Sequence, residues 1–574
     1  AYGMTGENRV FAETEGQEYD ALLFKVDLKR DEMRFYHLQL VHETNKDLFV
    51  LFTRWGEIGE TGMFQRTPQG SKEEGMKDFG KVFKEKTGNV WDPSASFERK
   101  PNKYQLLKRR RATARSEEMV QAFDPEVCAR SRLPHMLWRT LDCICDPEHI
   151  LQAVKSMGIK TQSMPFGSLS RATLDEAKNL LGEIKTANAE LKELRKARGA
   201  PKFGFAKAEE VLEASKKRNE VRERILELSS RYFELVPRGA GTTEVARPLE
   251  SDDALAKEFE MLINLREASA GLRTLLGARH WQKTVNPLDY CSQSMGMAFE
   301  RVNPESAEFK ALMDYMASTS SNPPTAAKPG DLPEALGQKR KNPFLGSRRG
   351  DTVTGIYRIA RDGEAERFKD LGNRRLLWHG SRRSNFISIL SQGLRVAPPE
   401  APVQGYMFGK GIYFADMFEK SRAYSAMGSQ EAVYMLLCDV SLGNMFPSHG
   451  AIYMEEPQAG TNCTWGVGHD QPNWANGLYE PGGAQLPLGG RQHGQSGCLG
   501  HSEFIVYDPA QVRMRYLVEL NNFESPTEKH VREKAEAEAR GESHPAKKPR
   551  EEPQEEEEQN HSEEDEDEED SDES

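Results

Sequence analysis

The spacing of hydrophobic residues changes along this 574-residue chain, and this change restricts it to several domains of different classes. Between residues 8 and 106, apolar and polar positions alternate in short runs such as Phe35–Val41, which predicts a small antiparallel sheet with a helix near 72–85. From 129 to 285, apolar residues recur at steps of three and four, which predicts an all-α domain. After residue 350, strand-like runs alternate with glycine-rich loops. The expected fold class is therefore multidomain α+β.

These patterns divide the chain into segments of distinct composition. We expect a sheet domain at 1–106, a basic linker at 107–128, an all-α domain at 129–285, an α+β domain at 286–523 and a disordered acidic tail at 524–574. Serine, proline, glycine and basic residues concentrate at 318–350, which indicates a flexible insertion. Residues 551–574 hold 16 acidic and no basic residues, so the net charge of −12 becomes +4 without them. Such a block cannot bury apolar surface, and we expect the domains to work without 524–574.

Composition also limits the compartment and the kind of site. No apolar run approaches the roughly 18 residues of a membrane span. No secretory signal peptide is recognisable, although a start at Ala1 leaves open residues before it. The seven cysteines are scattered and odd in number, which favours a reducing compartment, the cytosol or the nucleus. Cys143, Cys145 and His149 lie too close together for a four-ligand zinc site, so we expect no metal. Because no apolar run is long enough to span a membrane, we also expect no membrane partner.

Three local sequences in the last domain place polar or aromatic groups beside strand-like hydrophobic runs: Leu377–Arg382, Gly405–Asp416 and Glu503–Asp508. The glycines of the second sequence do not form a phosphate loop, because their spacing is one residue too short and Gly411 stands where that loop needs serine or threonine. Gly466–Gln471 lacks the last glycine of a dinucleotide fingerprint. The common nucleotide-binding folds are therefore poorly supported.

Taken singly, a packing role is the better interpretation of His379, Tyr413 and Glu503. Together with many other positions in the same order, however, they resemble the catalytic domain of the poly(ADP-ribose) polymerases along nearly its whole length. The further matching sequences are Asn385-Phe386, Ser391–Arg395, Ala397–Pro402, Lys420-Ser421, Tyr424, Leu442–Asn444 and Leu486–Gly489. Chance agreement over so many ordered positions is negligible.

The resemblance implies an enzyme that consumes NAD+ and transfers ADP-ribose, with His379, Tyr413 and Glu503 as its catalytic triad. Cleavage of the bond between nicotinamide and ribose develops positive charge on the ribose, much as in glycoside hydrolysis. Glu503 is expected to bond the ribose hydroxyl, to stabilise that charge and to help activate the acceptor hydroxyl.

The resemblance also implies how NAD+ is bound. The nicotinamide ring is expected between Tyr413 and Tyr424, with its amide on the backbone of Gly380 and the hydroxyl of Ser421. His379 is expected to hold the adenosine ribose. The complete set of implied NAD+-binding residues is His379, Gly380, Ser381, Asn385, Arg395, Tyr413, Lys420, Ser421 and Tyr424.

The all-α region is similar to the regulatory helical domain of the same family, through Met164–Ser170 and Leu228–Pro237. In the family, that domain blocks the access of NAD+ until DNA binding loosens it. One position departs from the pattern, because Ile263 stands where the family usually carries an acidic residue. We therefore expect altered polar contacts between this helix and the NAD+ site.

The N-terminal domain resembles the WGR module, which is named for a Trp-Gly-Arg turn, but the turn here reads Trp55-Gly56-Glu57. In the module, the tryptophan packs on a sugar at a DNA end and basic residues contact phosphates, where a carboxylate is repulsive. The implied DNA-binding residues are Trp55, Gly56, Arg66, Lys103, Lys108, Arg109, Arg110 and Arg111. The alternative is a small β domain that serves only contacts between domains.

The function that the resemblance implies is that of the small DNA-dependent type: a transferase activated by DNA ends. It is expected to modify proteins, including itself and with histones as candidates, and to elongate the product to poly(ADP-ribose). Two alternatives stay open: a mono-transferase, because some relatives with the same triad add one unit, and a catalytically weak scaffold that binds DNA ends. The DNA partner implies the nucleus, with Lys108–Arg111 and Lys547–Arg550 as weak import sequences.

Overall fold

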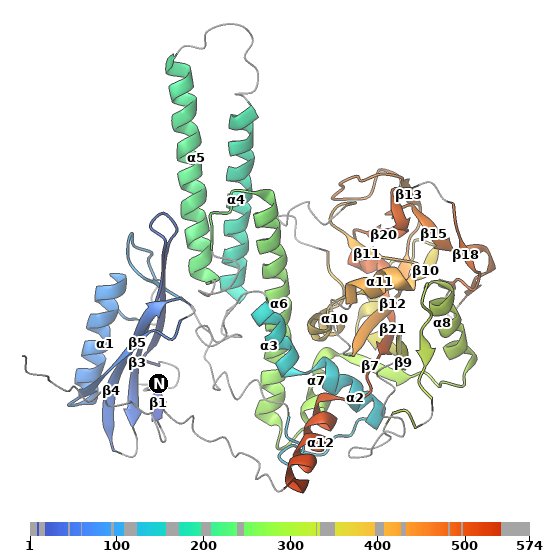
Figure 1. The fold of residues 1–574 in the computed structure, drawn as a ribbon, viewed down its shortest axis with the longest axis horizontal. Helices are drawn as coiled ribbons and strands as arrows, with labels where there is room; N and C mark the ends of the chain where they lie inside the picture. The colour runs from blue at the N-terminus through green and yellow to red at the C-terminus, as the bar shows by residue number, and fades with distance from the viewer. Residues whose placement is uncertain are drawn as a thin grey trace, which may run out of the picture.

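The computed structural model describes residues 8–10, 18–43, 46–58, 60–92, 97–107, 123–156, 171–196, 208–237, 246–328, 330–332, 350–396, 407–425, 432–479, 483–494 and 497–540. These residues form, in chain order, a sheet domain, a set of helices and an α+β domain (Figure 1). This order confirms the multidomain α+β class. No helix in the described ranges is both long enough and apolar enough to cross a membrane.

The N-terminal domain is an antiparallel sheet with one helix packed on it. Its strands are β1 (Asn8–Val10), β2 (Asp20–Asp27), β3 (Glu32–Glu43), β4 (Leu48–Glu57), β5 (Met63–Gln69) and β6 (Gln105–Leu106), in the order β5-β4-β3-β2-β6 with β1 beside β3. Helix α1 (Lys72–Thr87) buries Phe79 and Phe83 against the sheet. Ser71 accepts a hydrogen bond from the Glu74 amide at the start of α1, and Gly88 ends the helix with a φ of 74°.

The middle of the chain is helical. Its helices are α2 (His135–Ile144), α3 (Pro147–Ser156), α4 (Arg171–Lys196), α5 (Ala208–Leu235), α6 (Asp252–Trp281) and α7 (Pro287–Met295). Helices α4 and α5 lie side by side and extend away from the rest, while α6 lies between α4 and the C-terminal domain (Figure 1). Because α6 contacts partners on opposite sides, its buried residues are not confined to one face.

The C-terminal domain is built on an eight-stranded sheet in the order β16-β17-β10-β12-β21-β9-β7, with β8 beside β9. The central strand β12 (Val433–Ser441) is buried at every position, because both faces of the sheet are covered. A four-stranded sheet, β11-β20-β14-β13, and a three-stranded sheet, β18-β15-β19, complete the domain. A backbone bridge between Trp378 and Ala415 joins β10 to the residues after β11.

The remaining strands are β7 (Met297–Arg301), β8 (Thr325–Ala326), β9 (Thr352–Arg361), β10 (Arg374–Gly380), β11 (Ile412–Phe414), β13 (Met445–Ser448), β14 (Cys463–Gly466), β15 (Gly468–Pro472), β16 (Leu478–Tyr479), β17 (Gln485–Leu486), β18 (Arg491–Gln492), β19 (Leu499–His501), β20 (Glu503–Val506) and β21 (Val512–Leu520). The helices of this domain are α8 (Ala307–Ser318), α9 (Glu364–Arg367), η3 (Arg383–Asn385), α10 (Phe386–Gln392), α11 (Phe418–Ser425), η4 (Trp474–Asn476), η5 (Pro509–Gln511) and α12 (Pro526–Ala539).

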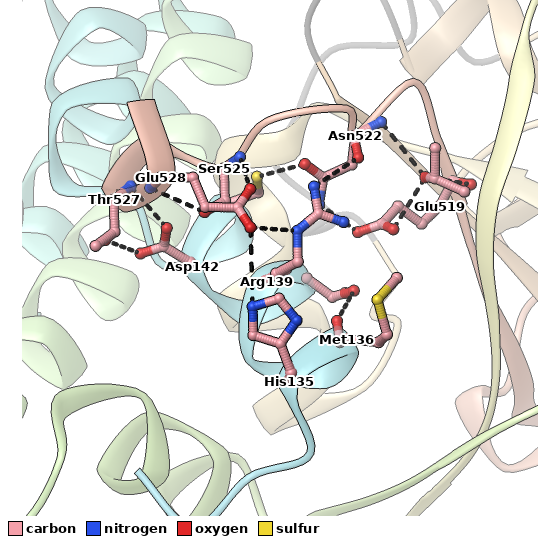
Figure 2. Close-up of polar contacts among 12 residues, drawn as sticks. His135, Met136, Arg139, Asp142, Glu519, Asn522, Ser525, Thr527 and Glu528 are labelled. Atoms are coloured by element: carbon pink, nitrogen blue, oxygen red, sulfur yellow. Dashed lines mark hydrogen bonds and ion pairs between the residues drawn. The ribbon is translucent and has the colours of Figure 1, made fainter. Parts of the chain in front are cut away.

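The prediction of a disordered tail that begins at residue 524 is wrong at its start. Helix α12 packs against α2, and Ser525 and Thr527 are buried at this contact (Figure 2). The acidic composition of 551–574 predicts disorder there, but it does not apply to α12, where polar side chains such as Thr527 have hydrogen-bond partners in the fold. Residues 541–574 lie outside the described residues.

Two other segment boundaries need correction. Thr325 and Ala326 form β8, which pairs in parallel with β9, so the start of the expected insertion at 318–350 belongs to the large sheet. Helix α7 contacts α2 and α6 as well as α10, so the helical region continues past residue 285. Residues 333–349, and the linker residues Lys108, Arg109, Arg110 and Arg111, lie outside the described residues.

Candidate active site

The candidate site begins where the end of β10 meets α11. A Cβ atom on Gly380 would lie 1.9 Å from the carbonyl oxygen of Ser421, so glycine is what allows the strand and the helix to approach this closely. The buried Ser421 hydroxyl donates to the carbonyl oxygen of Trp378 at 3.0 Å. The serine is thus fixed beside the last residues of β10.

A contact between β10 and β11 holds His379. Its Nδ1 lies 2.9 Å from the carbonyl oxygen of Tyr413. Because a carbonyl oxygen only accepts, Nδ1 carries the proton in this contact, and Nε2 of the neutral ring remains an acceptor. Burial lowers the pKa of His379, and the bond to the Tyr413 carbonyl opposes this effect. The imidazole is therefore neutral at physiological pH.

The Tyr413 side chain closes the glycine-rich turn that precedes it. Its hydroxyl donates to the carbonyl oxygen of Gly409 at 2.7 Å and accepts from the amide of Phe408 at 3.1 Å. Gly409 has a φ of 88°, and a Cβ atom there would lie 1.6 Å from the carbonyl oxygen of Met454. Gly409 therefore serves a tight turn that fixes the tyrosine, and not a phosphate loop.

Glu503 is the first residue of β20 and is held by an ion pair. Nζ of Lys420, on α11, lies 2.8 Å from Oε1 of Glu503 and also donates to the carbonyl oxygen of His501 at 3.2 Å. The lysine and glutamate side chains are only 15% and 12% exposed, so solvent screens the pair weakly. Glu503 is thus a positioned carboxylate rather than a mobile surface group.

Tyr424 is the exposed aromatic residue of the site. Its side chain, on α11, is 58% exposed. Partial burial raises the pKa of the phenol, and the negative charge of Glu503 adds to the rise. The tyrosine hydroxyl is therefore within electrostatic range of the carboxylate.

Asn385, Ser381 and Arg395 follow β10 in the chain, around η3 and α10. Nδ2 of Asn385 donates to Oγ of Ser381 at 3.1 Å. NH1 of Arg395 donates to Oε1 of Gln392 at 2.7 Å, and its NH2 forms an ion pair with Glu267 of α6. Arg395 is thus engaged by the helical region. The matching sequence Ala397–Pro402 lies outside the described residues.

Sequence reasoning missed Glu260 and Glu267, which lie on α6 three residues before and four residues after Ile263. Glu267 pairs with Arg395, and Oε1 of Glu260 lies 3.4 Å from NH2 of Arg382. Ile263 is partly buried and packs against the hydrophobic core. Two carboxylates therefore face the C-terminal domain on either side of an apolar residue. Their spacing of about one turn from Ile263 was the signal that could have found them.

Trp55 lies near the end of β4 and stacks on Tyr36, with ring centroids 6.0 Å apart and an interplanar angle of 17°. A Cβ atom on Gly56 would lie 2.8 Å from Cα of Gly62, so the turn needs glycine here. Glu57, which replaces the family arginine, ends the strand and is exposed. The structure thus keeps the frame of the tryptophan turn with the charge at its end reversed.

The basic residues expected to contact DNA differ in their surroundings. NH2 of Arg66, on β5, lies 2.7 Å from Oε1 of the buried Glu43, so part of its charge is offset within the domain. Nζ of Lys103 donates to the carbonyl oxygen of Glu85 at 2.9 Å. The aromatic residue Phe64 lies two positions before Arg66 on the same strand and is 47% exposed.

The N-terminal domain contacts the helical region along α5. The Leu28 amide donates to Oγ of Ser230 at 3.2 Å, and Nε of Arg99 donates to Oε2 of Glu234 at 3.2 Å. Burial raises the pKa of Glu234, and the charge of Arg99 opposes this effect. A cavity of about 530 Å³ lies at this junction and is lined by both regions.

Three family models match the chain in the order of these regions. They are the WGR domain over residues 19–98, the poly(ADP-ribose) polymerase regulatory domain over 131–291 and the poly(ADP-ribose) polymerase catalytic domain over 338–522. Similar proteins include "Poly [ADP-ribose] polymerase 1" of Gallus gallus, 31% identical over 90% of this chain and 46% of that protein. "Poly [ADP-ribose] polymerase 2" of Homo sapiens is 29% identical over 88% of this chain and 79% of that protein.

A third relative, "Poly [ADP-ribose] polymerase 2" of Arabidopsis thaliana, is 28% identical over 88% of this chain and 73% of its own length. The chain spans about half the length of several curated relatives, such as 46% of the Gallus gallus protein and 45% of the Danio rerio protein. The matched ranges fall, in this order, within the N-terminal sheet domain, the helical region and the C-terminal domain described above. The chain belongs to the poly(ADP-ribose) polymerases and carries a WGR, a regulatory and a catalytic domain.

Proposed function

We propose that this chain is an NAD+-dependent ADP-ribosyltransferase that is activated by DNA ends and elongates its product to poly(ADP-ribose). The observation that carries the proposal is the placement of Glu503, which Lys420 holds at 2.8 Å on the strand beside β11 and Tyr413. His379, bonded to the Tyr413 backbone, completes the arrangement. The family membership of the catalytic domain supports the same activity.

In the proposed reaction, the bond between nicotinamide and its ribose breaks and the acceptor hydroxyl attacks the sugar. The transition state has oxocarbenium character, so positive charge develops on the ribose. The Glu503 carboxylate accepts a hydrogen bond from a ribose hydroxyl and stabilises that charge, while it also orients the acceptor. The mostly buried ion pair with Lys420 keeps the carboxylate in place before the substrate arrives. Less free energy is therefore needed to reorient the carboxylate during the reaction.

The residues around the end of β10 provide the NAD+ site in this proposal. The nicotinamide ring lies between Tyr413 and Tyr424, which contributes about 0.5–1.5 kcal/mol per ring pair beyond burial. Its amide bonds the Gly380 backbone and Oγ of Ser421, which can accept because its own proton is donated to the Trp378 carbonyl. Nε2 of His379 accepts from the adenosine ribose.

The helical domain restrains this site in the proposal. Glu267 of α6 pairs with Arg395, which is expected to bind NAD+, and Glu260 lies 3.4 Å from Arg382 next to the triad strand. DNA binding by the WGR domain loosens α6 through the contacts of that domain with α5, such as Arg99 to Glu234. Acceptors include the chain itself and DNA-bound proteins such as histones, and this places the activity in the nucleus.

Incubation with labelled NAD+, with and without a nicked duplex, tests the proposal on a denaturing gel. A DNA-dependent ladder of products is expected. A single sharp shift would show a mono-transferase, and a chain that binds the duplex without using NAD+ would be a scaffold. Equal labelling with and without DNA would overturn the proposed activation.

A further inference from the structure

A polar cluster outside the candidate active site lies on the three-stranded sheet β18-β15-β19. Asp470 is on the middle strand, β15. The antiparallel pairing of Gln471 with Gln492, continued by one residue, places His493 opposite Asp470. On the other side, the parallel pairing with β19 places His501 beside Asp470. The carboxylate is thus flanked across the sheet by two histidines.

Two imidazole rings converge on the same oxygen of this carboxylate. Nδ1 of His493 lies 2.7 Å from Oδ1 of Asp470, and Nδ1 of His469 lies 2.8 Å from it. One atom from each of the three side chains lies within 4.8 Å of the others. The histidine side chains are 60% and 59% exposed, whereas Asp470 is 18% exposed. The set is therefore open to solution on one side and held by the sheet on the other.

We propose that His469, Asp470 and His493 form a binding site for one divalent transition-metal ion, of which Zn2+ is the representative example. Imidazole together with carboxylate suits zinc, copper and nickel, whereas Mg2+ and Ca2+ prefer oxygen ligands alone. Zinc binds nitrogen and carboxylate oxygen at about 2.0–2.2 Å, so its tetrahedral ligands lie roughly 3.3 Å from one another. The three ligand atoms already lie within 4.8 Å of one another, close to that spacing. Water fills the fourth position.

The charges around the cluster set how strongly a cation is held. Arg491 opposes the metal, because its NH1 lies 3.7 Å from Oδ2 of Asp470, although Glu419 also engages this arginine at 2.6 Å. The positive charge of Arg491 therefore limits the affinity of the site.

The metal would join two segments of the chain. Asp470 and His493 are separated by 23 positions. Coordination of both residues would cross-link the ends of the segment between β15 and β18 and thereby stabilise this segment. None of the three ligands belongs to the triad His379, Tyr413 and Glu503. Metal binding can therefore be tested without NAD+, and its outcome is independent of the proposed function.

The test is a titration of the full chain, freed of metal, with Co2+ as a spectroscopic probe and Zn2+ as competitor. We expect one Co2+ per chain with the intense visible absorption of tetrahedral coordination, displaced by Zn2+. Asp470→Asn and His493→Ala should each weaken binding by at least an order of magnitude. His280→Ala, at an exposed position of α6, is the matched control and should change nothing.

Arg491→Gln provides a variant with the opposite effect, because it removes the cation nearest to Asp470 and should tighten binding severalfold. Thermal unfolding of each variant without metal shows whether it is folded. Tetrahedral Co2+ absorption that is unchanged in Asp470→Asn and His493→Ala would overturn the proposal. So would the absence of saturable binding in the parent chain.

Discussion

The guanidinium of Arg139, wholly buried on α2, donates from Nε to Oε1 of Glu528 in the first turn of α12 at 2.7 Å (Figure 2). NH2 of the same arginine donates to the carbonyl oxygen of Asn522 at 3.3 Å. One turn along α2, Asp142 accepts from the amide and the hydroxyl of Thr527 at 2.8 and 2.7 Å. The C-terminal helix is therefore attached to the regulatory helices by buried polar contacts.

Glu528→Gln should destabilise the chain strongly. The substitution leaves the charge of Arg139 buried without its partner, and breaking a buried pair in this way costs roughly 3–5 kcal/mol. Glu536→Gln is the matched control on the same helix, because Glu536 pairs with Arg532 at the surface and should matter little. Thermal unfolding compares the two variants, and equal unfolding temperatures would contradict the role of the buried pair.

Truncation gives a second measure of the same contact and replaces the expectation that 524–574 is dispensable. A chain that ends at Arg540 keeps α12 and should unfold like the parent. A chain that ends at Phe523 loses Glu528 and Thr527, so it should unfold at a markedly lower temperature and lose activity with the fold. Identical stability of the two truncated chains would show that α12 contributes nothing.

The helix α12 also shows what the sequence could not predict. Its partner Arg139 is 389 positions away from Glu528, and no local pattern reports such a contact. The alternating runs of the N-terminal domain could be predicted because Leu23, Leu38 and Leu51, one each on β2, β3 and β4, share one core with α1. The triad could be assembled only by resemblance, since His379, Tyr413 and Glu503 come from three strands in two sheets. The ion pair between Arg395 and Glu267 of α6 could not be predicted for the same reason, because it joins segments that are far apart in the sequence.

Glu503→Gln should leave NAD+ binding largely intact while chain elongation collapses. The amide keeps the shape of the side chain but loses the charge that stabilises the transition state, and a loss of roughly 100- to 1000-fold in turnover is expected. Gel analysis with labelled NAD+ measures elongation, and calorimetry measures binding. Glu305→Gln, an exposed carboxylate in the same domain, serves as the control. An unchanged polymer ladder from Glu503→Gln would rule out the assigned role.

Glu267→Gln should raise the activity that the chain shows without DNA. The substitution releases Arg395 from α6, so NAD+ competes less with the helical domain for this arginine. We expect a severalfold higher basal rate and a lower KM for NAD+, with little change at saturating DNA. Glu183→Gln, exposed on α4, is the control. A basal rate that stays the same or falls would show that the pair does not restrain the enzyme.

Asp416 should make stability depend on pH near neutrality. This residue follows β11, is fully buried and accepts from Nε1 of Trp474 at 3.4 Å. Burial raises its pKa from 3.8 to about 7, against the opposing effects of Trp474 and Arg375. Because the folded pKa is the higher one, the protonated carboxyl contributes stability below pH 3.8 that is lost as the pH rises through 7.

Asp416→Asn removes this titration. The parent loses stability as the pH rises from 5.5 to 8, so the variant should gain stability relative to it. This trend is expected whatever the difference in stability between the two proteins at a single pH. Thermal unfolding at several pH values measures the difference, and Asp314→Asn, exposed on α8, is the control. A difference between Asp416→Asn and the parent that does not change with pH would contradict the prediction.

Glu57→Arg should tighten the binding of nicked or blunt DNA duplexes. If Trp55 contacts a DNA terminus, the exposed carboxylate two residues later lies near phosphate and weakens the complex. Arginine at this position adds one phosphate contact, which should steepen the logarithmic dependence of affinity on salt by about 0.9. Trp55→Ala removes the ring that stacks on Tyr36 and should lower both DNA affinity and DNA-stimulated activity.

Fluorescence anisotropy with a labelled nicked duplex, over a salt series, compares the parent with both variants. Asp31→Arg, which adds the same charge in the exposed turn after β2, separates a local contact from a general effect of net charge. A larger salt slope for Glu57→Arg than for Asp31→Arg supports a phosphate beside the tryptophan turn. If the parent shows no salt-sensitive binding and neither Glu57→Arg nor Trp55→Ala changes it, this domain serves contacts within the chain, such as Arg99 to Glu234, and DNA activation must act elsewhere.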